Sequence, residues 1–173
     1  MKPSVNHYSI NTKGRDIAVG DIHGCFSKLM KSLEAINFDF DNDRLFSVGD
    51  LVDRGDESNQ AIDWIYYHWF HACKGNHDQM AIDFARGPGW PMSLLDYSCN
   101  GGSWNIANSP EERETVALCF EDLPLGIEVE TANGLVGLIH AECPFNDWNK
   151  FKYSEQDFSV DNTSMWERSR YHN

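Results

Sequence analysis

Apolar runs and helical patterns alternate through the first half of the chain. Three short apolar runs are each followed by a glycine and polar residues, which is typical of buried strands that end in loops. The predicted strands are Asp16–Val19, Leu45–Val48 and Trp69–Cys73. Apolar positions at intervals of three and four residues predict helices after each strand. The predicted helices are Phe26–Ile36, Ser58–Trp69 and a segment around Met80–Ala85 that ends at Gly87.

The second half of the chain is less regular but contains a predicted hairpin. A proline and two glutamates begin the segment Pro110–Phe120, which predicts a helix. Alternation in Ile127–Glu130, followed by a turn and the apolar run Leu135–Ile139, predicts a β-hairpin with an Asn-Gly turn. Its second strand leads directly to His140. We expect the first dozen residues to form a loose arm or an edge strand.

The order of strands and helices predicts where the polar clusters meet. The first three strands lead into Gly20–Gly24, Gly49–Gly55 and Gly75–Asp78. Parallel α/β sheets bind ligands outside the carboxyl ends of their strands. We therefore expect the three clusters to converge at one edge of one sheet.

Composition narrows the class of protein. The 173 residues are 41% hydrophobic, which is enough apolar material for one folded domain spanning residues 1–173. A net charge of −13 argues against nucleic-acid and anionic-membrane partners, because both require clustered Lys and Arg. Five widely spaced cysteines without a C-x-x-C pair favour a reducing cytoplasm. We expect neither a signal peptide nor a membrane span, since no apolar run approaches the ~20 residues that a span needs.

The polar clusters contain the residue types that bind divalent metals. Asp21 and His23 lie two positions apart and can face one ion. Asp50 arrives on the neighbouring strand and can bridge two ions, with Asn76 and His140 on the second. These donors suit Mn, Fe, Zn or Co. A single Asp-Gly turn is commonplace, but three such clusters after three predicted strands favour a common site.

Nearby residues fit the hydrolysis of phosphate esters. Two metal ions about 4 Å apart can clamp a phosphate and generate a hydroxide for in-line attack. His77 is then a candidate general acid for the leaving alcohol, with Asp53 or Asp78 to orient it. Arg54 can bind phosphate oxygens through its guanidinium group. Arg168 is a further arginine in an otherwise acidic chain.

These motifs resemble the signatures of the phosphoprotein-phosphatase family, and in particular its phage and enterobacterial serine/threonine phosphatases. The similarity extends from about Arg15 to Arg170. The segments that carry it are GDIHG (Gly20–Gly24), GDLVDRG (Gly49–Gly55), GNHD (Gly75–Asp78), NGGSW (Asn100–Trp104) and HAE (His140–Glu142). The last differs from the family pattern, which has Gly or Asp in place of Glu142.

The resemblance implies an α/β (α+β) fold class, in the form of a β-sandwich flanked by helices. It implies two divalent metal ions, manganese first, with iron or zinc as alternatives. The implied roles are a first metal site of Asp21, His23 and Asp50, a second of Asp50, Asn76 and His140, an acid dyad of Asp53 and His77, and a phosphate clamp of Arg54 and Arg168. Arg170 is left without a role.

The family pattern continues beyond Asn173 with several strands and a Gly-His-Thr block, whose histidine is another ligand of the second metal. His172 is not expected to replace it, because a terminal residue is usually mobile. We therefore expect weak binding of the second metal and a sandwich without its last strands. The exposed sheet edge could be covered in a homo-oligomer. A shortened gene product, a fragment of a longer chain and a natural short form all stay open.

Three functions are compatible with these features. The first is a phosphatase for phosphoserine and phosphothreonine in proteins, with phosphotyrosine as a further substrate. The second is a hydrolase of diadenosine tetraphosphate, which shares the same motifs. The third is a catalytically impaired protein that binds phosphoproteins. Turnover of a phosphopeptide, turnover of the dinucleotide, and phosphate binding without turnover would distinguish them.

Overall fold

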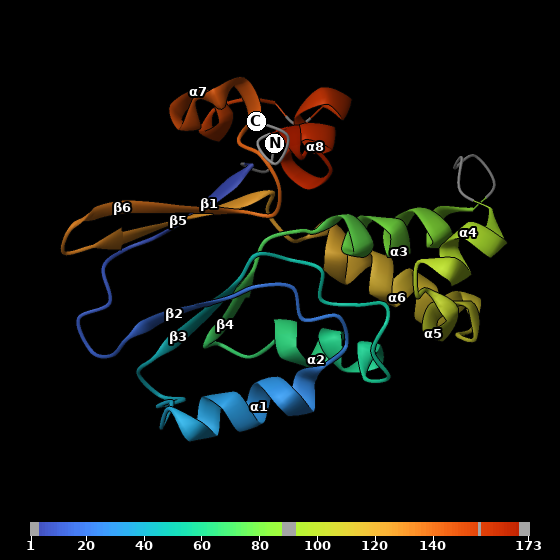
Figure 1. Cartoon of the computed structure of the whole chain (residues 1–173), viewed down its shortest axis with the longest axis horizontal. Coiled ribbons are helices and arrows are strands. Elements are labelled where there is room, and N and C mark those ends of the chain that lie inside the picture. Colours follow the sequence, from blue (N-terminus) through green and yellow to red (C-terminus); the bar gives the residue numbers. More distant parts are fainter. Residues whose placement is uncertain (1–3, 88–92, 156, 170–173) are drawn as a thin grey trace.

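The computed structural model describes residues 4–87, 93–155 and 157–169. Within these ranges the strands form two three-stranded sheets, with the orders β2-β3-β4 and β1-β5-β6. The strands are β1 (Val5–Tyr8), β2 (Asp16–Val19), β3 (Arg44–Ser47), β4 (Phe70–Ala72), β5 (Gly126–Thr131) and β6 (Gly134–Ile139). Figure 1 shows the two sheets facing each other, which confirms the predicted sandwich.

The β2-β3-β4 sheet is entirely parallel, as the sequence predicted. Residue Ile17 pairs with Leu45, and Leu45 pairs with Phe70. The crossover between β2 and β3 contains α1 (Phe26–Ala35), and the crossover between β3 and β4 contains α2 (Ala61–Ile65). Because parallel strands end at the same edge of a sheet, the loops after β2, β3 and β4 begin side by side.

The β1-β5-β6 sheet mixes both pairings. Strand β1 lies parallel to β5 at the edge of this sheet, and β5 and β6 form the predicted antiparallel hairpin. Thr131 pairs with Gly134, so the loop consists of Ala132 and Asn133. The prediction of Asn-Gly as the turn is therefore wrong by one position, since Gly134 already belongs to β6.

The remaining helices cover the outer faces of the sheets and one end of the sandwich (Figure 1). Helices α7 (Trp148–Lys152) and α8 (Phe158–Met165) lie over the β1-β5-β6 sheet, while α1 and α2 lie under the parallel sheet. The other helices are α3 (Asn76–Arg86), α4 (Leu94–Cys99), α5 (Ser103–Ile106) and α6 (Pro110–Glu121). Short 3-10 turns occupy Ser58–Gln60 and Pro144–Asn146.

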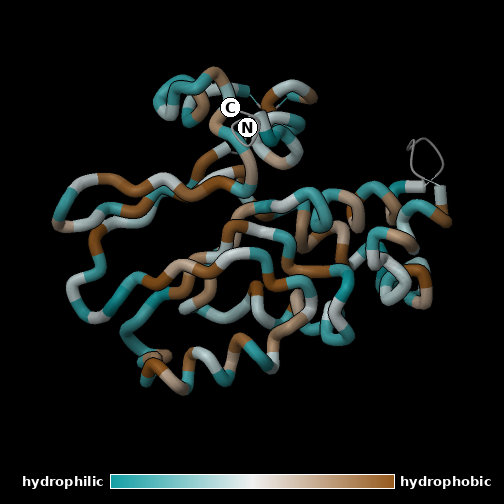
Figure 2. Tube along the Cα trace, viewed as in Figure 1, coloured by the Kyte–Doolittle hydropathy of each residue, from teal (hydrophilic) through white to brown (hydrophobic). Residues whose placement is uncertain are grey.

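Each space between layers has its own buried cluster. Phe26, Leu45 and Phe120 belong to the largest cluster, between the parallel sheet and its helices. Phe46 and Ile127 pack between the two sheets. A third cluster joins the β1-β5-β6 sheet to α7 and α8. It consists of Val5, Leu125, Phe151, Val160 and Met165. Figure 2 shows the corresponding hydrophobic stretches along the strands and the helices that face them.

Two predicted helix boundaries are corrected. The helix predicted for Ser58–Trp69 ends at Ile65, because the chain must turn back before β4 begins at Phe70. Its buried aromatic residue is Trp64, while Tyr66 is 74% exposed. The third helix begins at Asn76, several residues earlier than its apolar pattern suggested. The Gly75–Asp78 cluster therefore forms the start of a helix rather than a loop.

The β-hairpin leaves apolar surface exposed. Within the described residues β6 pairs only with β5, and its Leu135 and Val136 are 61% and 45% exposed. Among the described residues, no helix has the length and apolar character that crossing a membrane would require.

Candidate metal centre and active site

The predicted polar clusters converge at the carboxyl ends of the parallel strands. Asp21 follows β2, Asp50 follows β3, and Asn76 is the first residue of α3. The Ile22 and His23 amides both donate to the Asp50 carbonyl oxygen, at 3.0 and 2.8 Å, which joins two of the clusters directly. His140 reaches the same place from the end of β6, in the other sheet. The convergence expected from the sequence is therefore present.

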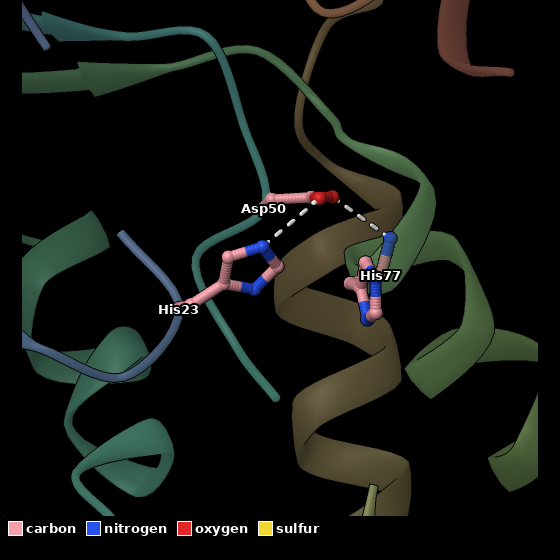
Figure 3. Close-up of side chains that lie close together, drawn as sticks. All are labelled: His23, Asp50 and His77. Atoms are coloured by element: carbon pink, nitrogen blue, oxygen red, sulfur yellow. Dashed lines mark hydrogen bonds and ion pairs between the residues drawn. The ribbon is translucent and has the colours of Figure 1, made fainter. Parts of the chain in front are cut away.

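The carboxylate of Asp50 lies at the centre of the site and is 3% exposed. Its oxygens lie 3.5 Å from Nε2 of His23 and 3.6 Å from Nε2 of His140. One oxygen also accepts the backbone N–H of His77 at 2.9 Å. Figure 3 shows Asp50 between His23 and His77. Asp50 is thus the residue shared by the two groups of donor atoms, one with His23 and His77 and one with Asp21 and His140.

His23 presents a nitrogen lone pair that its surroundings do not satisfy. Its Nδ1 lies 2.9 Å from the Val52 carbonyl oxygen, so Nδ1–H donates and Nε2 is left as an acceptor. Nε2 is buried and has no hydrogen-bond partner among the described residues. It faces carboxylate oxygens of Asp50 at 3.5 Å and Asp21 at 3.9 Å. A buried lone pair among anionic oxygens fits a cation, because only a positive centre would satisfy all three groups.

His140 repeats this arrangement on the other side of Asp50. Its Nδ1 donates to the Val48 carbonyl oxygen at 2.9 Å, which leaves Nε2 as an acceptor. Nε2 lies 2.9 Å from Oδ1 of Asn76. Imidazole nitrogen, amide oxygen and carboxylate oxygen are acceptors of the kinds that divalent ions of the manganese–zinc series bind. The second group of donors therefore also fits a divalent metal.

A buried hydrogen-bonded chain lies beside these donors. Nδ1 of His77 lies 2.8 Å from Oδ2 of Asp53, and the two residues are 2% and 0% exposed. Oδ1 of Asp53 accepts the indole N–H of Trp104 at 2.7 Å. Nη2 of Arg54 donates to Nε2 of His77 at 2.9 Å, so in this structure the His77 proton resides on Nδ1. Trp104 was not among the predicted site residues, and the Asn100–Trp104 motif was its sole sequence signal.

The structure separates the two carboxylates that were candidates to orient His77. Asp53 makes that contact, whereas Asp78 accepts the backbone N–H groups of Asp50, Leu51 and Gly75 at 2.8–2.9 Å. Asp78 belongs to the first turn of α3, where a carboxylate caps the helix instead of pointing at a neighbouring side chain. Burial and the neighbouring charge of Asp50 raise the pKa of Asp78 above its ordinary value. Asp78 therefore anchors the loop that carries Asp50.

Two predicted arginines reach the site from opposite sides. Arg54 is exposed and lines an open cavity of about 490 Å³ together with His23, Lys28 and other residues. Nη2 of Arg168 lies 3.5 Å from Nε2 of His140. Arg168 follows α8 instead of lying on a helix, because that helix ends at Met165. Residues 170–173, which include Arg170 and His172, lie outside the described residues.

Known proteins resemble either most of this chain or a shorter part of it. The profile of the calcineurin-like phosphoesterase family matches residues 17–170. Serine/threonine-protein phosphatase 1 of Salmonella typhimurium is 36% identical over 157 residues, which are 87% of this chain and 71% of that protein. The symmetrical bis(5'-nucleosyl)-tetraphosphatase of Methylobacillus flagellatus is 42% identical over 72 residues, which are 40% of this chain and 26% of that protein.

A solved structure has a fold similar to that of this chain. The crystal structure of a protein assigned as a diadenosine tetraphosphatase superimposes with a TM-score of 0.64 at 25% identity. The match covers 92% of this chain and 62% of that one, so this chain spans less than two thirds of the solved protein. The family implies divalent metal ions, in agreement with the two groups of donor atoms around Asp50. The chain belongs to the calcineurin-like phosphoesterase family, whose members are metal-dependent hydrolases.

Proposed function

We propose that this chain hydrolyses phosphate monoesters on phosphoproteins, mainly phosphoserine and phosphothreonine, with phosphotyrosine as a further substrate. The observation that carries the proposal is the position of Asp50, buried between the metal-binding donors and the backbone of His77. The name of the Salmonella relative supports the class of substrate. The five cysteines are free thiols, which supports a site of action in the reducing cytoplasm.

We assign the first metal site to Asp21, His23 and Asp50, and the second to Asp50, Asn76 and His140, with manganese as the physiological metal. The unsatisfied Nε2 of His23 supports the first site, and the facing acceptors of His140 and Asn76 support the second. Bound there, two divalent ions would neutralise charge on the phosphate and activate a water for in-line attack.

The residues beside the metal donors supply binding and proton transfer. Arg54 binds the phosphate through its guanidinium fork. When the Arg54 side chain moves from His77 to the phosphate, Nε2 of His77 becomes exposed to the substrate. Asp53 stabilises the protonated imidazole through Nδ1–H. The Nε2–H bond of His77 then breaks as a new O–H bond forms on the leaving alkoxide, and neutral His77 keeps its Nδ1 proton. Arg168 binds the same phosphate from the side of His140.

The test is hydrolysis of a phosphoserine peptide with titrated manganese. We expect saturable, manganese-dependent turnover by the wild type, and a loss of about 100-fold or more in kcat for His77→Asn, because general acid catalysis contributes that much. His68→Asn serves as the control, since His68 is an exposed histidine outside the site. A folded wild type that binds phosphate without turnover at any manganese concentration would contradict the proposal and favour the impaired phosphoprotein-binding function.

Hydrolysis of diadenosine tetraphosphate is the second candidate. The Methylobacillus relative and the solved structure favour it, although the former matches only 40% of this chain. We expect kcat/KM for the phosphopeptide to exceed that for the dinucleotide, measured at the same manganese concentration. A higher kcat/KM for the dinucleotide would contradict the phosphoprotein proposal and favour hydrolysis of diadenosine tetraphosphate.

A further inference from the structure

Trp104 contacts the acid dyad from a segment that carries no other predicted site residue. It lies on α5, after the turn that follows α4, and its side chain is half-buried. The indole nitrogen Nε1 lies 2.7 Å from Oδ1 of Asp53. An indole N–H is a donor only, so the direction of this hydrogen bond is fixed.

The contact uses the oxygen of Asp53 that His77 leaves free. Oδ2 of Asp53 accepts from Nδ1 of His77 at 2.8 Å, and Oδ1 accepts from Trp104. Asp53 is 0% exposed, so water does not compete for either oxygen. With both oxygens bound, the carboxylate has one orientation, and rotation about its terminal bond would break two hydrogen bonds in a buried place.

The same segment also holds the backbone next to Asp53. Asp53 and Arg54 both have a φ of 70°, a conformation that non-glycine residues avoid unless their surroundings hold it. The Arg54 amide donates to the Gly101 carbonyl oxygen at 3.4 Å. Gly101 lies so close that a Cβ built on it would be 2.3 Å from the Arg54 nitrogen. The turn before α5 therefore packs directly against the strained pair.

We propose that Trp104 is a positioning residue for proton donation by His77. This inference rests on the proposed function, in which His77 protonates the leaving alcohol. By fixing Asp53, Trp104 holds the His77 imidazole so that Nδ1–H stays on Oδ2 and Nε2 faces the substrate. Trp104 does not touch the reacting atoms. Its effect must consequently depend on how much the leaving group needs a proton.

This dependence on the leaving group can be tested, because a general loss of structure would lower kcat equally on all substrates. We compare Trp104→Phe with the wild type on phenyl phosphate and on p-nitrophenyl phosphate. Phenol has a pKa close to that of tyrosine, about 10, whereas p-nitrophenol is a much better leaving group that requires little protonation. We expect Trp104→Phe to lower kcat about tenfold on phenyl phosphate, part of what general acid catalysis contributes, and less than about threefold on p-nitrophenyl phosphate. An equal loss on both substrates, or no loss, would overturn the proposal.

The chain offers a matched control in Trp148. Its indole Nε1 also donates to a buried carboxylate, Oε2 of Glu128, at 2.8 Å, but it lies on α7 away from the dyad. Trp148→Phe removes the same kind of hydrogen bond and should leave the ratio of the two kcat values unchanged. A double variant provides the second control. In an Asp53→Asn background, Trp104→Phe should cause little further loss, because it acts through Asp53.

An independent measurement does not require turnover. The six tryptophan indole N–H signals can be recorded by 1H–15N NMR, and Trp104→Phe identifies the one from Trp104. Asp53→Asn removes the anionic acceptor, so we expect the Trp104 signal to shift and the Trp148 signal to stay. An unshifted Trp104 signal would overturn the positioning role. A wild type that hydrolyses neither substrate, with a shifted Trp104 signal, would instead contradict the proposed function.

Discussion

At the scale of single residues, the site depends on backbone conformations that most amino acids avoid. His23, Asp50 and Asp53 have φ values of 45°, 51° and 70°. Such conformations cost about 1–3 kcal/mol each and persist only where neighbouring groups hold them. For Asp50 these groups are the carboxylate of Asp78, which accepts its N–H, and the amides that donate to its carbonyl oxygen. The strain places the Asp50 carboxylate among the other donors.

The loop before Asp50 is closely packed at Gly49. Its φ is +102°, and a Cβ built on it would lie 2.4 Å from the backbone nitrogen of Gly75. Gly87 has a similar φ of +90°, but a Cβ there would meet nothing within 4 Å among the described residues. We expect Gly87→Ala to cost about 1–3 kcal/mol from the backbone alone, and Gly49→Ala roughly twice that, because its methyl group overlaps backbone that cannot move without displacing Asp50.

Chemical denaturation of both variants without metal measures this difference. Equal losses would mean that the Gly49 loop can move away from Gly75. The loss of activity should be larger still for Gly49→Ala, because it displaces Asp50, which we propose as the ligand shared by the two metal sites.

At the scale of elements, one buried carboxylate connects β1, β5 and α7. Glu128 on β5 is 1% exposed. It accepts hydrogen bonds from Lys152 and Trp148 of α7, and its other contact is Nδ1 of His7 on β1 at 2.8 Å. A buried carboxylate is tolerated only when it is paired and hydrogen-bonded in this way. The network therefore fixes α7 against both strands.

The charge of Glu128 makes this connection dependent on pH. The hydrogen bond from Lys152 is the main reason that the pKa of Glu128 is lowered from 4.5 to about 2. Because the folded pKa is below the unfolded one, the stabilisation is fully present above about pH 4.5 and is lost as the pH falls toward about 2. We expect Glu128→Gln to cost about 2 kcal/mol at pH 7 and progressively less below pH 4.5.

Denaturant unfolding of wild type and variant between pH 7 and pH 3 checks this prediction. Glu130→Gln is the control, because Glu130 lies on the same strand, pairs with Nε2 of His7 at 3.2 Å, and is 44% exposed in its side chain. It should change stability little at any pH. A Glu128→Gln cost that stays constant down to pH 3 would contradict the assignment of the pKa.

At the scale of the whole molecule, the proposed metal donors come from both sheets. Asp21 and Asp50 follow strands of the parallel sheet, whereas His140 follows β6 of the other sheet. The donors that meet at Asp50 therefore link the two halves of the sandwich. Without a cation, they also bring carboxylates together in a chain whose net charge is already −13.

Manganese should consequently stabilise the entire fold. A ligand at one hundred times its Kd stabilises the folded state by about 2.7 kcal/mol per site. We expect the melting temperature to rise with manganese and to fall back with a chelator. The rise should be smaller in His140→Ala, which removes the donor from the second sheet, and unchanged in His68→Asn. Calorimetry or fluorescence melting measures these shifts, and an equal rise in His140→Ala would exclude His140 as a ligand.

Much of this architecture follows from the sequence. The apolar runs before Gly20, Gly49 and Gly75 determined three parallel strands, because short apolar segments alternating with amphipathic ones have few other ways to bury their faces. Strand order then brought Asp21, Asp50 and Asn76 together at one edge. Local periodicity was sufficient for these elements because each buries a face that repeats along the chain.

Other features were decided only by the tertiary structure. The residue pattern left both Asp53 and Asp78 open as partners of His77, and only the family resemblance implied Asp53. In the structure the choice depends on the start of α3, where Asp78 is held by three backbone amides. Trp104 reaches Asp53 from 51 residues away in the chain, a contact that no local pattern encodes. Periodicity along a chain reports which face of an element is buried, whereas the partner of a polar side chain depends on which distant elements pack against it.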